Sequence, residues 1–154
     1  MRSKILFMLI FFSISTQRII AQTNDSSSIA KSLVELANIC KNVDFTDAKS
    51  MELGYFYKAA PYIVYRGDNA NRKWKSACNY NNPSEKEQVD ATCERINQSI
   101  NQDSTFKIVE YMTEKESEGT WHVLMVQYLK KGTLKTTAFA FLKIGNKFLL
   151  GDID

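Results

Sequence analysis

The stretch STFKIVEYMTEKESEGTWHVLMVQYLKKGTLKTTAFAFLKIGNKFLLGDID, residues 104–154, decides the fold of this chain. It holds four runs rich in β-branched and aromatic residues, at 105–112, 120–129, 134–144 and 147–153. The connectors EKESEG, KKG and GN each contain a glycine, which supplies the positive φ that tight turns need. Because links this short join antiparallel neighbours, the sequence predicts a four-stranded antiparallel meander.

Two helices are predicted between residues 29 and 60. The first runs to about residue 41, and its apolar residues recur at the spacing of one helix face: Ile29, Leu33, Leu36, Ala37 and Cys40. The second can begin at Thr46, which is a suitable N-cap. It is expected to stop or kink at Ala60, because Pro61 lacks a backbone donor and disfavours helix in the residue before it.

A third helix is expected from Asn82 to about Ile100. Asn82 can cap it, Pro83 suits the first turn, and Glu85 can reach back as in a capping box. The apolar stripe of this helix is narrow, which is typical of a surface helix. The preceding residues 62–82 are compatible with a short hairpin or with a helical turn and an irregular loop, and we favour the hairpin.

The predicted sheet is apolar on both faces near its middle. In the run 120–129, one face carries Trp121, Val123 and Met125, while the other carries His122, Leu124 and Val126. A sheet with one face in water alternates more cleanly between apolar and polar residues. We therefore expect the outer face to be covered by the chain itself or by a partner, and a homodimer through this face is one such arrangement.

Residues 1–21 resemble a secretory signal peptide. Arg2 and Lys4 precede a short apolar run, and Ala21 offers a small residue for cleavage. The run is shorter than the ~20 apolar residues that a membrane span needs. An uncleaved anchor is the alternative, because apolar residues continue beyond the run. We expect cleavage after Ala21, a single domain at residues 22–154, a secreted or periplasmic location, and no membrane span after cleavage.

The charge of the chain argues against nucleic-acid binding. The chain has 20 Lys and Arg residues and 17 Asp and Glu residues. Loss of Arg2, Lys4 and Arg18 with the signal peptide leaves 17 basic residues against 17 acidic ones, so the formal charge becomes zero. A neutral domain lacks the positive field that non-specific nucleic-acid binding requires, so we expect no nucleic-acid partner.

Three cysteines are present: Cys40, Cys78 and Cys93. Export would place them in an oxidising compartment, where a disulfide can form. Cys78 and Cys93 flank a polar segment, and a bridge between them would close a loop of ~15 residues. We therefore predict a Cys78–Cys93 disulfide, with other pairings or no bridge as the alternatives. Cys40 is expected to be a small buried residue on the first helix.

The order of the elements resembles the NTF2-like (cystatin-like) α+β superfamily. The chain runs helix, helix, short hairpin, helix and four-stranded meander, and its closing KIGNKFLLGDID is similar to the last hairpin of small secreted domains of this kind. The resemblance implies an α+β fold in which helices pack on a curved antiparallel sheet of four or more strands to form a cone. It also implies a pocket between sheet and helices, which serves catalysis in isomerase-like and cyclase-like members and binding in many others.

Few residues of the chain suit catalysis or metal binding. His122 is the one histidine, which excludes zinc sites built on paired histidines within one chain, and its position inside a strand indicates a structural role. The sequence has neither a glycine-rich phosphate loop nor a GxSxG motif. We assign no catalytic residue, no metal ligand and no cofactor, and we favour a non-enzymatic protein without excluding catalysis.

Tyrosine and tryptophan are the one unusual enrichment in the chain. These side chains suit pocket walls and interfaces, although an aromatic core is the plainer interpretation. We select Tyr62, Tyr65, Arg66 and Trp74, at the mouth of the expected cone, as candidate binding residues. The sequence thus predicts a secreted or periplasmic binding module for a small apolar ligand or a partner protein. The alternatives are a small NTF2-like isomerase or hydrolase, and a periplasmic inhibitor or immunity-type protein.

Overall fold

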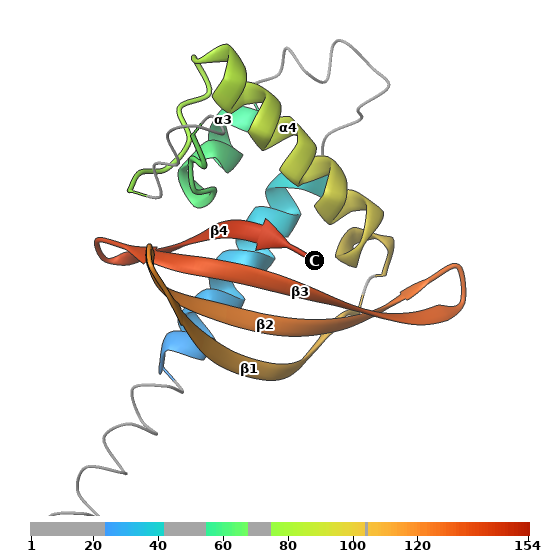
Figure 1. Cartoon of the computed structure of the whole chain (residues 1–154). Coiled ribbons are helices and arrows are strands. Elements are labelled where there is room, and N and C mark those ends of the chain that lie inside the picture. Colours follow the sequence, from blue (N-terminus) through green and yellow to red (C-terminus); the bar gives the residue numbers. More distant parts are fainter. Residues whose placement is uncertain (1–23, 42–54, 68–74, 104) are drawn as a thin grey trace, which may run out of the picture.

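The computed structural model of the chain describes residues 24–41, 55–67, 75–103 and 105–154. It is an α+β fold in which helices pack against a four-stranded antiparallel sheet, as predicted (Figure 1). Residues 24–41 are helical and cross one face of the sheet, which we call the inner face. The opposite face is the outer face. The predicted signal peptide and the predicted N-cap Thr46 lie outside the described residues.

The four strands follow one another across the sheet in chain order. They are β1 (Lys107–Glu116), β2 (Gly119–Lys130), β3 (Thr133–Ile144) and β4 (Lys147–Ile153). The expected end of the first strand at residue 112 is wrong, because β1 continues to Glu116 and pairs with β2 up to Gly119. The turn between β2 and β3 consists of Lys131 and Gly132, both with positive φ, as two-residue hairpin turns require.

Two bulges determine which side chains of β1 and β4 face the core. In β1 the pairing register shifts at Val109, and in β4 it shifts at Gly151. Simple alternation would point Asp152 to the same face as Leu150, because successive side chains in a strand change sides. The extra residue reverses this, so that Ile153 enters the core and Asp152 faces outward with Ala140.

The core lies between the helices and the inner face of the sheet. The predicted stripe of the first helix is confirmed, since Ile29, Leu33, Leu36, Ala37 and Cys40 are all buried. They pack with inner-face side chains of the sheet such as Leu124, Phe139 and Phe141. This burial removes apolar surface from water and is the main force that holds helices to sheet.

The helix α4 (Pro83–Gln98) begins where the sequence predicts and ends slightly earlier than Ile100. A 3₁₀ turn, η2 (Ile100–Gln102), follows it. Asn82 is the N-cap residue, but Glu85 does not close a capping box with its backbone. The buried Glu85 carboxylate instead accepts hydrogen bonds from the Asn79 backbone N–H, at 2.6 Å, and from the Asn82 side-chain amide. These bonds fix the loop that leads into α4.

The predicted stop of the second helix at Pro61 is confirmed. The described part of this helix, α3 (Tyr55–Ala59), gives way to a 3₁₀ turn, η1 (Ala60–Tyr62). After it, Val64 pairs with Ala77 in an isolated antiparallel bridge, so the two arms of the expected short hairpin are paired at this point. Residues 68–74 between them lie outside the described residues. Ile63 also pairs with Leu150 in a parallel bridge, so the segment lies along the edge of the sheet beside β4.

The predicted Cys78–Cys93 disulfide is wrong. The bridge joins Cys40 to Cys93, and Cys78 is a buried free thiol. Cys40 and Cys93 lie on the buried stripes of two different helices, which meet in the core. Amide groups reinforce this junction, because Asn97 donates to the Cys40 carbonyl at 2.8 Å and Asn101 donates to the Ala37 carbonyl at 2.9 Å. The bridge therefore clamps the first helix to α4.

Substitution of Cys93 by alanine tests this pairing. The bridge spans 53 positions of sequence, and closing a loop of that length restricts the unfolded chain by roughly 4 kcal/mol in the chain-entropy description. We expect Cys93→Ala to lower the free energy of unfolding by roughly 2–5 kcal/mol in urea titrations. Cys78→Ala, the control, removes only a buried thiol and is expected to cost clearly less. The pairing would be contradicted if both variants lost the same free energy of unfolding. It would also be contradicted if peptide mapping of the non-reduced protein found a disulfide-linked peptide that contains Cys78.

Candidate functional site

Two rows of carboxylates run along the outer face of the sheet. The pairing register places Glu114 opposite Trp121 and Glu116 opposite Gly119, on the outer side of β1. On the other side, Asp152 lies opposite Ala140, and Asp154 exchanges two backbone hydrogen bonds of 2.9 Å with Ala138. The strands between the two rows present small and apolar side chains. The outer face is therefore an apolar strip with an acidic border on each side.

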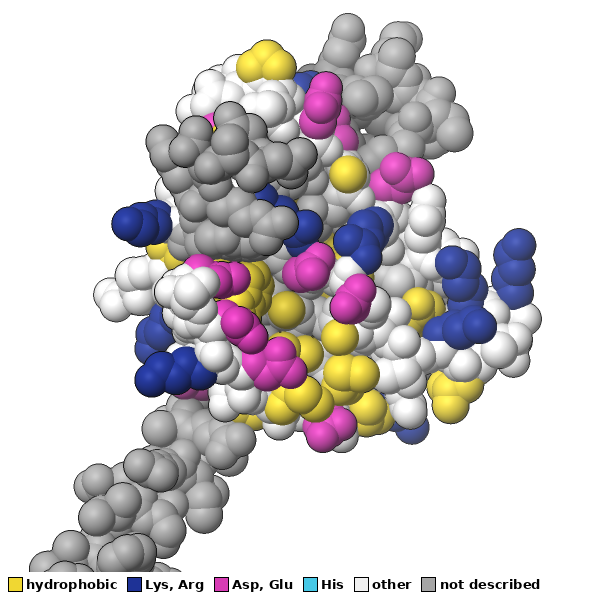
Figure 2. Space-filling model, viewed as in Figure 1, with side chains coloured by type: hydrophobic (Ala, Val, Ile, Leu, Met, Phe, Trp, Pro, Cys, Tyr) yellow, Lys and Arg dark blue, Asp and Glu magenta, His cyan; other side chains and the backbone are white. Residues whose placement is uncertain are grey.

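A hollow of about 780 Å³ lies over this strip. We call it the acidic hollow. Its floor is formed by Trp121, Val123, Ala138 and Ala140, and its wall by residues 66–67 and the first half of α4. Figure 2 shows hydrophobic side chains along the middle of this face and acidic side chains beside them. The carboxylates that line it are Glu87, Glu114, Glu116, Glu118, Asp152 and Asp154.

Among the described residues that line the acidic hollow, Arg66 is the one basic residue. It forms a 2.5 Å ion pair with Asp152 and donates to the Gly151 carbonyl from Nε at 2.6 Å. The Gly151 residue is the bulge of β4, so its carbonyl is available to the guanidinium instead of a neighbouring strand. Among the described residues, six carboxylates and one guanidinium line the hollow, so this part of its lining is net negative.

The position of Arg66 depends on a glutamine of α4. The Gln88 side chain donates to the Val64 carbonyl and accepts a hydrogen bond of 3.1 Å from the Arg66 backbone N–H. These two bonds hold the segment of Arg66 against α4. The wall of the hollow is therefore built from backbone and side-chain contacts between elements that lie far apart in the sequence.

This arrangement suits a ligand that combines positive charge with an apolar group. A negatively charged hollow raises the local concentration of cations and speeds their association. Its floor offers a small apolar surface, because Trp121 and Val123 are buried and Ala138 and Ala140 are half-buried. Among the described residues, no group of three or more His, Cys, Asp or Glu side chains is arranged to hold a metal ion.

Three of the four predicted binding residues are described, and they do not converge on one site. Arg66 lines the acidic hollow, and Tyr65 packs partly buried against the main core. Tyr62 lines a separate hollow, where a hydrogen bond with Glu35, together with burial and the charge of Glu35, raises the Tyr62 pKa to about 12. Trp74 lies outside the described residues.

The carboxylate row of β1 is the feature that sequence reasoning missed. Glu114, Glu116 and Glu118 recur at every second position, and this spacing places side chains on one face of a strand. The prediction assigned all three to a polar connector, because charged residues around Gly119 are also typical of a turn. This is wrong for Glu114 and Glu116, which belong to β1, and correct for Glu118, which lies in the turn. The alternation was the available signal.

His122 occupies the inner face, away from the acidic hollow. Its Nδ1 lies 2.7 Å from the Tyr111 hydroxyl, and its ring meets the Phe148 ring edge-on with centroids 4.9 Å apart. Burial lowers the His122 pKa, and the positive charge of Lys143 adds to this effect while Asp25 opposes it. A neutral, hydrogen-bonded ring within an aromatic cluster fits the structural role expected from the sequence.

Comparison of the chain with known protein families, curated proteins and solved structures finds no match. In the described parts of the chain, no helix combines the length and the apolar character needed to cross a bilayer.

The lowered His122 pKa predicts how stability depends on pH. The folded protein disfavours the protonated ring, so its His122 pKa lies below the value of about 6.5 in the unfolded chain. Below pH 6.5 the unfolded chain therefore binds a proton more readily than the folded protein does. We expect the free energy of unfolding to fall as pH decreases from 7 towards 5. His122→Phe should flatten this dependence, whereas Tyr111→Phe, which keeps the titrating ring, should retain it. Urea titrations at several pH values provide the measurement, and an equal slope in His122→Phe would refute the assignment.

Proposed function

We propose that this protein is an exported, non-enzymatic binding module that holds a positively charged segment of a partner protein in the acidic hollow. The observation that carries the proposal is the apolar strip of β2 and β3 between carboxylates of β1 and of the chain end. Glu114 and Glu116 border it on one side, and Asp152 and Asp154 on the other.

The geometry favours a protein segment over a small apolar ligand. The inner face, where a cone-shaped fold would hold such a ligand, is occupied by fully buried side chains of the sheet and helices, among them Phe139, Phe141 and Leu33. The acidic hollow lies on the other face and is bordered by charge. A wholly apolar molecule would gain nothing from these carboxylates and would remove water from them at a cost.

Binding requires both parts of the site. An exposed ion pair contributes about 0.2–1 kcal/mol, and full burial of a leucine side chain contributes about 1.5–3 kcal/mol. Association itself costs about 4–15 kcal/mol in lost translational and rotational freedom. Neither kind of contact alone exceeds this cost, so a partner needs several cationic side chains together with at least one apolar side chain.

The location and family proposed from the sequence fit this function. A Cys40–Cys93 disulfide is typical of proteins that fold in an oxidising compartment, which supports export to the periplasm or the medium. The NTF2-like resemblance is supported by helices packed on an antiparallel sheet. Within such a family, this chain would use the outer face of the sheet rather than the interior of the cone. An inhibitor or immunity-type protein is the special case in which the partner is an enzyme.

A short cationic peptide tests the proposal. We expect the peptide Lys-Leu-Lys-Lys-Leu-Lys to bind in isothermal titration calorimetry, and its acidic counterpart Glu-Leu-Glu-Glu-Leu-Glu not to bind. Raising NaCl from about 50 to 500 mM should weaken binding, because salt screens exposed charges.

The matching variants locate the binding surface. Glu114→Gln with Glu116→Gln should weaken peptide binding roughly fivefold or more, as expected for two lost ion pairs of up to about 1 kcal/mol each. Glu94→Gln, an exposed position of α4, is the control and should bind like the unaltered protein. If both peptides bind equally, or if the control loses as much affinity as the double variant, the acidic hollow is not the site.

A further inference from the structure

The turn between β2 and β3 is positively charged, whereas the acidic hollow is lined by carboxylates. We define the basic tip as Leu129, Lys131 and Leu134. The neighbouring Lys130 and Lys135 alternate to the inner side of the sheet, since Lys135 lies opposite Tyr128. Leu129 and Leu134 face each other across the hairpin and are 48% and 60% exposed. Lys107 of β1, opposite Gln127, adds a further positive charge beside the tip. The nearby Asp103 carboxylate already accepts a 2.7 Å hydrogen bond from the Leu129 backbone N–H.

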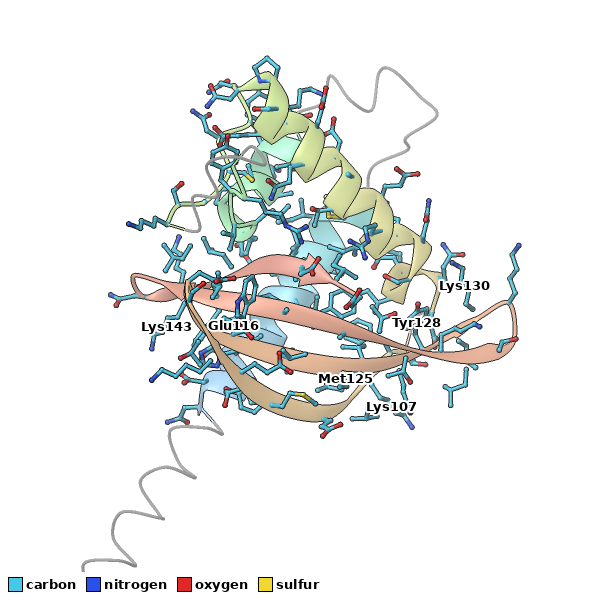
Figure 3. The ribbon with its side chains drawn as sticks, viewed as in Figure 1. Lys107, Glu116, Met125, Tyr128, Lys130 and Lys143 are labelled. Carbon is cyan, nitrogen blue, oxygen red and sulfur yellow. A yellow bond between two sulfur atoms is a disulfide. The ribbon has the colours of Figure 1, made fainter. Side chains whose placement is uncertain are left out.

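The basic tip and the acidic hollow lie at opposite ends of one face. Leu129 shares the outer side of β2 with Val123 and Trp121, because these residues are separated by even numbers of positions. Met125 lies midway along β2 between Leu129 and Trp121. Figure 3 shows Glu116 towards one end of the sheet, Lys107 and Lys130 towards the other, and Met125 between them. The face is thus apolar along its middle and negative at one end, and it carries the positive charges of Lys107 and Lys131 at the other.

We propose that the partner of the acidic hollow is a second copy of this chain. Two copies meet by their outer faces with their strands antiparallel, so that the basic tip of each copy enters the acidic hollow of the other. This inference rests on the proposed function, because it identifies the partner of the same hollow.

Symmetry makes the two contacts equivalent. A two-fold axis that lies in the interface near Met125, perpendicular to the strands, exchanges the two ends of the face. Both tips then meet carboxylates at the same time, and the assembly closes as a dimer. An axis parallel to the strands would place tip against tip and hollow against hollow, which like charges disfavour. The distribution of charge therefore selects the antiparallel arrangement.

The size of the face predicts a weak dimer. Ten strand residues at about 3.3 Å each and four strands about 4.8 Å apart give at most roughly 500 Å² per copy, or roughly 1,000 Å² in total. The free area is smaller, because residues near Val64 already cover part of this face. Stable specific interfaces bury about 1,200–2,000 Å², so this contact falls among the transient ones. We expect a dissociation constant of about 10–100 µM at low salt, with dissociation at high salt.

Charge reversal tests the contact through sedimentation velocity of the purified full chain. The tip variant carries Lys107→Glu and Lys131→Asp; aspartate suits the positive φ at that turn position. The hollow variant carries Glu114→Lys and Glu116→Lys. Each variant alone brings like charges together at both contacts and should be monomeric at about 200 µM, where the unaltered protein is largely dimeric. An equimolar mixture pairs opposite charges at both contacts and should form a heterodimer.

The control variant is Lys31→Glu with Lys41→Glu, which changes the net charge as much as the tip variant does. Both lysines are exposed on the helix at residues 24–41, which packs on the inner face, so this variant should remain dimeric. Heterodimer formation in the mixture also shows that the two charge-reversed variants are folded.

Three results would overturn the inference. They are a monomeric unaltered protein at low salt, charge-reversed variants that still form homodimers, and a mixture that stays monomeric. If the unaltered protein is monomeric but binds the Lys-Leu peptide, the proposed function stands and only the second copy is excluded as partner. The unaltered protein could also be monomeric and sediment with vesicles of anionic phospholipid. If the tip variant does not sediment with them, the basic tip binds a lipid surface instead.

Discussion

The Gly151 bulge is the constraint on which the site depends. Without an extra residue in β4, strand alternation would direct Asp152 into the core and Ile153 into water. A bulge leaves a carbonyl outside the regular ladder, and a buried carbonyl without a donor is unfavourable. Arg66 supplies the donor and pairs with Asp152 at the same time. One side chain thus makes the bulge tolerable and forms part of the wall of the acidic hollow.

Much of the fold follows from local patterns in the sequence. Strand alternation and turn glycines predicted the meander, and helical spacing predicted the buried stripe from Ile29 to Cys40. The strand boundaries near Glu114 and Glu116 were missed, because charged residues at a strand end and in a turn have the same composition. The disulfide was missed for a different reason. Spacing favours cysteines that flank one loop, whereas Cys40 and Cys93 meet only because two helices bury the same face against one sheet.

The site was the least predictable part, since it is assembled from segments that are distant in sequence. Arg66 reaches Asp152 across the bridge between Ile63 and Leu150, and Gln88 of α4 holds it there. No local pattern links these residues. The sequence did indicate that both faces of the sheet are apolar near the middle, and that the outer face needs a cover. The structure adds that residues near Val64 cover one part of this face and that carboxylates border the rest.

The exposed edge of β1 has a consequence for how the molecule avoids aggregation. β1 pairs with β2 alone in the described sheet, so its other side presents backbone donors and acceptors to solvent. A long flat edge of this kind can recruit the same strand of another chain and grow into fibrils. The bulge at Val109 interrupts the regular spacing of those groups, and Glu110, Glu114 and Lys115 place charges along the strand. Stacking of chains edge to edge is thereby opposed, which leaves the faces of the sheet rather than its rim for specific contacts.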